Sequence, residues 1–263
     1  MSGLPFEREI ATARAAAVAA GEIIARYSLG NRESWDKKED NPVTQADLEA
    51  NQCILDRLAE VFPDDAILSE ETVDSPDRLD AERLWVIDPL DGTKEFIEGV
   101  PQFAVSVALA IGGEPVVGVV FQPLTRECFW AAKGRGAYLG ETRLELSSAP
   151  QLEQSKMLSS RTEMKRGQIG PYLDWFGEIE PVGSAAFKLA LVACGRGDLW
   201  LSTSPKSEWD VCAGDILVRE AGGTFVTLGD GERTYNQRDI LLQPDMLAGP
   251  QALIEQYRAR KNA

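Results

Sequence analysis

The sequence predicts a layered α+β fold, because the pattern of secondary structure changes along the chain. Two amphipathic helical segments come first, a run of short apolar strands follows, and helices then alternate with strands. A length of 263 residues allows one large domain or two closely joined lobes. We expect an N-terminal α+β lobe over residues 1–150 and a C-terminal α/β lobe over 151–263, which together would form one site.

The first two helices are predicted from the spacing of their apolar residues. Residues 5–28 carry apolar side chains three or four positions apart, and Pro5 suits a first helical turn. Residues 30–41 are polar and are followed by Pro42. A second helix is predicted over residues 44–61, where a Phe-Pro pair closes it.

Short runs rich in Val, Ile, Ala and aromatic residues predict strands in the middle of the chain. These runs are residues 66–69, 84–87, 103–111, 115–121, 128–132 and 137–139. The Gly-Gly-Glu sequence between the third and fourth runs predicts a hairpin.

The second half of the chain is predicted to alternate helices with strands from about Met157 onward. The predicted helices are residues 164–176, 184–195 and 209–221, and the predicted strands are near 198–202, 224–227 and 239–242. Gly222-Gly223 supplies a stop for the last helix.

The absence of histidine excludes many mechanisms. With no His in the chain, Ser-His-Asp and Cys-His catalysis, phosphohistidine chemistry and mixed Cys/His zinc sites are impossible. The four cysteines are scattered without a CxxC pair, so neither a zinc ribbon nor a dithiol redox motif is predicted. Carboxylates must therefore hold any metal.

The charge balance is strongly acidic. The chain has 27 Lys and Arg against 42 Asp and Glu, which gives a net charge of −15. This charge repels phosphate backbones and anionic lipids, so we expect neither a nucleic-acid polymer nor a membrane as partner. The first residues lack a signal-peptide pattern, and no stretch approaches the roughly 18 apolar residues of a membrane span, which predicts a cytoplasmic protein.

The densest chemical signal is an apolar strand that runs into two carboxylates. Asp88 and Asp91 flank a Pro-Leu pair and precede Gly92. Such a turn can aim two carboxylates and a backbone carbonyl into one pocket, and hard divalent cations such as Mg²⁺ prefer these oxygen ligands. The alternative is an ordinary surface turn, since Asp, Pro and Gly are common turn formers.

A second acidic segment ends the preceding predicted strand. Ser69 is followed by Glu70 and Glu71, so two adjacent strands would each deliver acid to the same edge of a sheet. Close carboxylates must protonate, separate or share a cation. The alternative is a solvated loop, because Glu pairs are abundant on surfaces.

Asp47 and Asp210 lie in the first turns of predicted helices. Each allows a capping role, since Thr44 and Ser207 stand three residues earlier. Each also allows a functional role, with Asp210 as a further metal ligand and Asp47 as a carboxylate that orients water.

Gly183 and Ser184 open another predicted helix, whose backbone N–H groups could receive a phosphate oxygen. Lys188 lies one turn further along, and the plainer interpretation is a helix entry with a solvated lysine.

Other phosphate-handling motifs are absent from the sequence. No Walker A sequence occurs, no cysteine has an Arg six residues later, and Asp88 and Asp91 have two residues between them rather than one. Phosphoryl transfer to a Cys or Asp nucleophile is therefore disfavoured, and direct attack by metal-activated water remains.

Three ordered segments resemble the signatures of the inositol monophosphatase family of Mg²⁺-dependent, lithium-sensitive phosphatases. They are Ser69-Glu70-Glu71, Asp88-Pro89-Leu90-Asp91-Gly92-Thr93 and Trp209-Asp210-Val211-Cys212-Ala213-Gly214. Further segments around Thr44, Gly183 and Glu220 extend the resemblance over nearly the whole chain. The resemblance implies a five-layered αβαβα sandwich, a small phosphorylated metabolite as substrate and a homodimer.

The resemblance also implies roles for individual residues. Glu70, Asp88 and the Leu90 carbonyl would hold one Mg²⁺ ion, and Asp88, Asp91 and Asp210 a second, with two or three ions per site. Thr93, with Asp47 and Glu70, would activate the attacking water. The implied substrate-binding residues are Asp91, Gly92, Thr93, Gly183, Ser184, Lys188 and Asp210.

The choice of substrate depends on fewer residues. Lys94-Glu95-Phe96 is similar to the branch that acts on 3′-phosphoadenosine 5′-phosphate, and Lys188 resembles a phosphate-binding lysine of that nucleotidase branch. The first prediction is therefore a 3′(2′),5′-bisphosphate nucleotidase. The alternatives are an inositol-1-monophosphatase with broad sugar-phosphate activity and a non-catalytic module that binds Mg²⁺ or a phosphorylated ligand.

Overall fold

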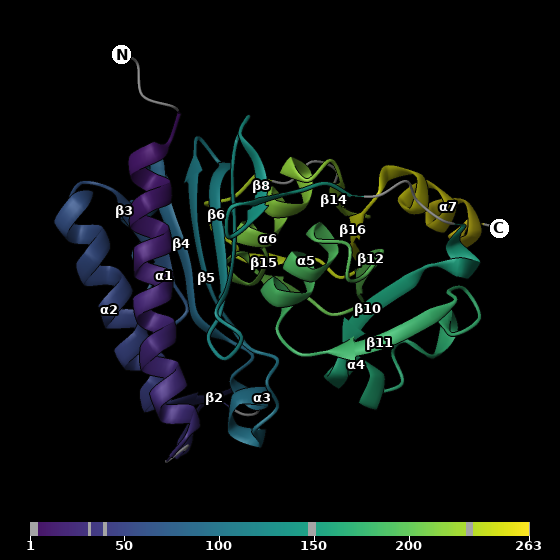
Figure 1. The fold of residues 1–263 in the computed structure, drawn as a ribbon, viewed down its shortest axis with the longest axis horizontal. Helices are drawn as coiled ribbons and strands as arrows, with labels where there is room; N and C mark the ends of the chain where they lie inside the picture. Colours follow the sequence, from purple (N-terminus) through teal and green to yellow (C-terminus); the bar gives the residue numbers. More distant parts are fainter. Residues whose placement is uncertain (1–4, 31–32, 39–40, 147–150, 230–233, 263) are drawn as a thin grey trace.

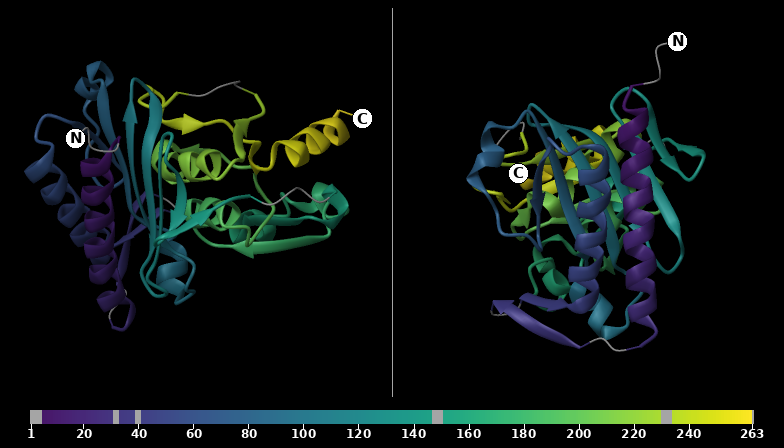
Figure 2. Two further views of the ribbon diagram at one scale, coloured as in Figure 1. Left: turned by 45° about the horizontal axis from the view of Figure 1, so that its top comes forward. Right: turned by 90° about the vertical axis from the view of Figure 1, so that its left-hand side faces the viewer.

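The chain forms five stacked layers in the order αβαβα (Figure 1). The computed structural model describes residues 5–30, 33–38, 41–146, 151–229 and 234–262. Helices α1 (Glu7–Ser28) and α2 (Gln45–Val61) form the first layer, side by side on one face of the first sheet (Figure 2). Helices α5 (Ala185–Ala193) and α6 (Glu208–Glu220) separate the two sheets, and α4 (Arg161–Lys165) and α7 (Gln251–Lys261) lie beyond the second sheet. This layering confirms the predicted sandwich.

The first sheet has seven strands in sequence order. They are β3 (Ala66–Ser69), β4 (Arg83–Asp91), β5 (Ala104–Ile111), β6 (Glu114–Gln122), β7 (Glu127–Ala132), β8 (Gly136–Leu139) and β9 (Thr142–Leu144). Strands β3 and β4 are parallel, and the remaining neighbours are antiparallel. Alternation along β4 buries Trp85 and Ile87 with α1 and α2, and Leu84 and Val86 with α5 and α6.

The second sheet has five strands in the order β11-β10-β12-β16-β14. They are β10 (Lys156–Ser160), β11 (Glu178–Val182), β12 (Leu199–Ser202), β14 (Thr224–Thr227) and β16 (Met246–Gly249). Both faces are buried, because Trp200 packs in the core shared with α5 and α6, whereas Leu199 and Leu201 pack in the core that contains α7. The predicted lobe boundary near residue 150 falls at residues 147–150, which lie outside the described residues.

Helix α6 approaches the first sheet closely at Gly118 of β6. A Cβ at this position would lie 2.5 Å from Ile216 Cγ2 and 2.6 Å from the Ala213 carbonyl oxygen. Glycine is therefore required by the spacing between the sheet and the helix. This contact sets the distance between α6 and the first sheet, and α6 carries Asp210 in its first turn.

One predicted helix of the second half is wrong, and one predicted strand is shorter than expected. The helix predicted over 164–176 ends at Lys165, because Gly167 adopts a positive φ of 72° and the Gly170-Pro171 pair begins a short 3₁₀ turn (Gly170–Tyr172). The strand predicted over 239–242 shrinks to β15 (Leu241–Leu242), which pairs with β13 (Lys206–Ser207) and not with the five-stranded sheet.

Several elements were not predicted. In the first half, the polar segment forms a hairpin of β1 (Ser34–Lys38) with β2 (Asn41–Thr44), and α3 (Thr93–Glu98) follows the acidic turn. Strands β9, β10, β11 and β16 and helix α7 were also missed.

Among the described residues, no helix has the length and apolar character that crossing a membrane requires.

Candidate functional site

The acidic turn at the end of β4 is built by local hydrogen bonds and one glycine. Pairing with β5 is interrupted between Asp88 and Asp91, and the Leu90 N–H donates to Asp88 Oδ1 at 3.0 Å. Gly92 adopts a φ of 99°, and a Cβ there would lie 3.0 Å from the Gln102 carbonyl oxygen. The turn therefore needs glycine for its backbone conformation and for its close approach to the neighbouring loop.

Three carboxylates from two distant parts of the chain meet at this turn. Oxygens of Asp88, Asp91 and Asp210 lie within 4.8 Å of one another, and Asp88 and Asp91 are buried. Burial and the neighbouring acids raise the pKa of Asp88 well above its usual range, and they raise the pKa of Asp210 to about 8. A set of close, buried carboxylates fits a hard divalent cation, which removes the cost of placing these charges together.

Glu70 reaches the same cavity from the neighbouring strand. Because β3 and β4 are parallel, their carboxyl ends meet at one edge, and the Glu70 N–H donates to the Ile87 carbonyl at 3.2 Å. The charge of Glu70 contributes to the raised pKa values of Asp88 and Asp210. The expected convergence of two acidic strand ends is confirmed, although Glu70 lies outside the group of three carboxylates within 4.8 Å.

Asp210 and Asp47 both cap their helices. Asp210 Oδ2 accepts the Ser207 N–H at 2.8 Å, and Asp47 Oδ2 accepts the Thr44 N–H at 2.8 Å. Asp210 also lines the cavity, so capping and a place in the carboxylate group occur together. Asp47 reaches the cavity through Thr93, whose Oγ1 lies 3.1 Å from Asp47 Oδ1 and 3.1 Å from the Leu90 carbonyl oxygen. Burial raises the pKa of Asp47 to about 6.

Ser184 joins the start of α5 to the acidic turn. It adopts a positive φ of 56°, which is costly for a residue with a side chain, and its Oγ accepts the Phe187 N–H at 2.9 Å. The Ser184 hydroxyl and the Ala186 N–H both donate to Asp91 Oδ2, each at 2.6 Å. The predicted helix start therefore lies at the site, where it binds a carboxylate of the chain.

Lys188 is buried, so its interpretation as a solvated lysine is wrong. Its side chain is 2% exposed, and Nζ donates to the carbonyls of Val182 at 3.0 Å and Ser184 at 2.7 Å. Burial lowers its pKa to about 8. Two of the three ammonium donors thus support the turn before α5, and the residue still borders the cavity.

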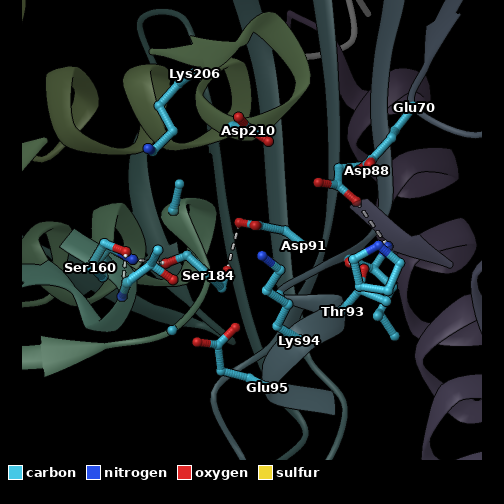
Figure 3. Close-up of a pocket in the computed structure, with 17 residues that line it drawn as sticks. Glu70, Asp88, Asp91, Thr93, Lys94, Glu95, Ser160, Ser184, Lys206 and Asp210 are labelled. Carbon is cyan, nitrogen blue, oxygen red and sulfur yellow. Dashed lines mark hydrogen bonds between the residues drawn. The ribbon is translucent and has the colours of Figure 1, made fainter. Parts of the chain in front are cut away.

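One cavity of about 220 Å³ brings the predicted site residues together (Figure 3). Ten of them line it, namely Glu70, Asp88, Leu90, Asp91, Gly92, Thr93, Gly183, Ser184, Lys188 and Asp210. Three residues that were not predicted also line the cavity from the second half of the chain, namely Ser160, Thr162 and Lys206. The signal for Lys206 was its position four residues before Asp210, in the segment that leads into the same helix.

Comparison with known proteins agrees with this geometry. The model of the inositol monophosphatase family matches residues 7–260 of the chain. The chain belongs to the inositol monophosphatase family. Since this is a family of phosphatases, the chain is a phosphoric monoester hydrolase.

Relatives within the inositol monophosphatase family carry several names. A protein of Thermotoga maritima named fructose-1,6-bisphosphatase/inositol-1-monophosphatase is 36% identical over 216 residues, which cover 78% of each chain. The crystal structure of the extragenic suppressor protein SuhB from Bartonella henselae has a TM-score of 0.84 and 30% identity, over 96% of this chain and 98% of that chain. CysQ from Bacteroides thetaiotaomicron has a TM-score of 0.79 and 30% identity, over 95% and 99% of the two chains.

Proposed function

We propose that this chain is a Mg²⁺-dependent phosphomonoesterase that prefers a small metabolite with two phosphate groups. The observation that carries the proposal is a cavity that joins three close carboxylates to Lys94 and Lys206. Carboxylates suit cations that accompany the reacting phosphate, and lysines suit a further anionic group. The first candidate substrate is 3′-phosphoadenosine 5′-phosphate, supported by Lys94-Glu95-Phe96 and by the likeness to CysQ.

The cations would be held by oxygen ligands at the end of β4 and the start of α6. We assign Glu70, Asp88 and the Leu90 carbonyl to one ion and Asp88, Asp91 and Asp210 to a second, in a site for two or three ions. When bound, the ions would neutralise phosphate charge and acidify water. Asp91 is held for this role by Ser184 and by the Ala186 N–H.

The chain's own groups would position the attacking water and receive its proton. Thr93 Oγ1 lines the cavity and is hydrogen-bonded to Asp47 and to the Leu90 carbonyl. Asp47, whose pKa is raised to about 6 by burial, would accept a proton relayed through Thr93 near neutral pH. Glu70, which lies beside Asp88 in Figure 3, would help to activate the same water.

A second candidate is inositol-1-monophosphatase activity with broad action on sugar phosphates. The cavity volume of about 220 Å³ suits a single polyol ring, and Lys188 uses two donors on main-chain carbonyls rather than on a ligand. The name of the Thermotoga maritima relative includes this activity.

We further propose that the chain forms a homodimer, because of the family resemblance. Sedimentation equilibrium of the full chain would test this proposal.

The test is phosphate release from 3′-phosphoadenosine 5′-phosphate and from inositol 1-phosphate, with Mg²⁺ and with a chelator. Mg²⁺-dependent release with preference for the nucleotide supports the first candidate. Preference for inositol 1-phosphate supports the second. No release from either compound contradicts the proposed activity on both substrates.

A further inference from the structure

Lys206 brings a positive charge to the side of the cavity opposite Glu70 and Asp88. It lies in β13, between the end of β12 and the start of α6. Its side chain is only 16% exposed and borders the same cavity as the carboxylates. In Figure 3 its ammonium group lies on the same side of the cavity as Ser160, away from Glu70 and Asp88.

A buried carboxylate holds the segment that carries Lys206. Glu163 of α4 is 2% exposed, and its Oε1 lies 3.7 Å from Lys206 Nζ. The same oxygen accepts the Ser202 hydroxyl at 2.7 Å, the Ser204 N–H at 3.0 Å and the Thr203 N–H at 3.2 Å. Glu163 therefore fixes the backbone of residues 202–204, and the ion pair fixes the direction of the Lys206 side chain.

The contacts of Lys206 leave it able to bind an anion. Its Nζ donates to the Pro205 carbonyl at 3.4 Å and pairs with Glu163 at a distance longer than a hydrogen bond. An ammonium group has three donors, so these contacts do not use its full capacity. A lysine kept for structure alone would not need to border the cavity. Ser160 and Thr162 line the same cavity.

We propose that Lys206, positioned by Glu163, binds the phosphate group of the substrate that is not hydrolysed and so sets a preference for bisphosphorylated over monophosphorylated esters. This inference rests on the proposed function, because it assumes that the reacting phosphate lies at the carboxylates. Lys206 lies on the Asp210 side of the carboxylate group, and its charge acts on both Asp91 and Asp210. A second phosphate bound beyond these two acids would therefore face Lys206. The lysine acts as a compact point charge, which suits phosphates carried on different small molecules.

Two matched ligand pairs test the proposal. 3′-Phosphoadenosine 5′-phosphate and 3′-AMP differ only in the 5′-phosphate, and inositol 1,4-bisphosphate and inositol 1-phosphate differ only in the 4-phosphate. For the Lys206→Gln variant we expect a KM about tenfold or more higher for the preferred bisphosphate, against less than about threefold for its matched monophosphate, with a small change in kcat. Calorimetric titration of the same ligands in the presence of Ca²⁺ gives a readout that does not need turnover.

Three further variants separate recognition from structure. Lys206→Arg keeps the charge and should retain most of the preference. Lys165→Gln removes an exposed lysine of α4, the helix that carries Glu163. It should leave the ratio of the KM values for the bisphosphate and the monophosphate as in the wild type. Glu163→Gln keeps the size but loses the charge that orients Lys206, so it should raise the KM for the bisphosphate while kcat changes little.

The outcomes distinguish this proposal from the proposed function. A wild-type chain that binds neither bisphosphate more tightly than its matched monophosphate overturns the role of Lys206. Equal losses for both members of a pair in Lys206→Gln, in a variant with an unchanged circular dichroism spectrum, also overturn it. A chain that releases no phosphate, but whose bisphosphate preference is lost in Lys206→Gln by calorimetry, overturns the activity and supports the recognition site.

Discussion

The Ser184 hydroxyl lies 2.6 Å from Asp91 Oδ2, although 93 positions separate the two residues in the chain. The bond connects the start of α5 to the end of β4, and the Ala186 N–H donates to the same oxygen. Ser184 donates this bond from an unusual backbone conformation, with a φ of 56°. The direction of the Asp91 carboxylate is therefore set by the second half of the chain.

Ser184→Ala should loosen the Asp91 carboxylate and weaken the start of α5. We expect the free energy of unfolding to fall by about 1 kcal/mol, since a helix cap is lost, and cation affinity or activity to fall roughly 10- to 100-fold. Urea denaturation and Mg²⁺-dependent phosphate release measure the two effects. Ser75→Ala is the matched control, because Ser75 caps an exposed 3₁₀ turn and should affect neither cation affinity nor kcat.

Asp91→Asn should abolish most turnover and leave the fold intact. Asn can still accept from Ser184 and Ala186 through its amide oxygen, but it removes a charge from the carboxylate group. We expect kcat to fall roughly 100- to 1000-fold or more, with an unchanged circular dichroism spectrum. Asp56→Asn, on the exposed side of α2, removes one charge far from the cavity and should keep wild-type activity. Full activity in Asp91→Asn would show that this carboxylate does not serve the reaction.

Stabilisation by Mg²⁺ should increase with pH. The pKa of Asp210 in the folded chain is about 8, above the ordinary value of 3.8, so the folded state binds more protons than the unfolded state between these values. Without cation, the free energy of unfolding falls as pH rises through this window, and bound Mg²⁺ offsets that loss. Thermal unfolding with and without Mg²⁺ should therefore show a larger rise in Tm at about pH 8.5 than at about pH 5.5. An equal or smaller rise at the higher pH would contradict the role of these carboxylates.

Gly118→Ala should destabilise the packing of α6 on the first sheet. The new Cβ would lie 2.6 Å from the Ala213 carbonyl oxygen, which is main chain and cannot rotate away. We expect a loss of about 1–3 kcal/mol in the free energy of unfolding, measured by urea denaturation. Gly30→Ala is the control, since nothing lies within 4 Å of a Cβ there and stability should change little. Equal stability of the two variants would show that α6 can shift to make room.

The parts of the site that follow from local sequence were predictable. Asp88 and Asp91 lie at the end of the long buried strand β4, and Glu70 directly follows the parallel strand β3, so their convergence follows from strand order. The capping boxes of Asp47 and Asp210 are local as well. Their patterns allowed two roles for each residue, and only the fold shows that a cap can also face the cavity.

The parts that depend on long-range contacts were not predictable. The pair of Glu163 and Lys206 joins α4 to β13, and no pattern in either segment indicates the other. Glu163 itself fell at the edge of a predicted helix that Gly167 ends early. Strands β10 and β16 were missed because each is only a few residues long, and their stability comes from neighbours on both sides in the sheet.

The three residues of the carboxylate group are synthesised at different times. Asp88 and Asp91 are synthesised early, whereas Asp210 is synthesised only after strands β5 and β6 and helix α5. Until then the first two acids cannot form the three-carboxylate group. The group can therefore bind a divalent ion only late in synthesis. A product truncated before α6 would keep the two carboxylates of the turn but would lack Asp210.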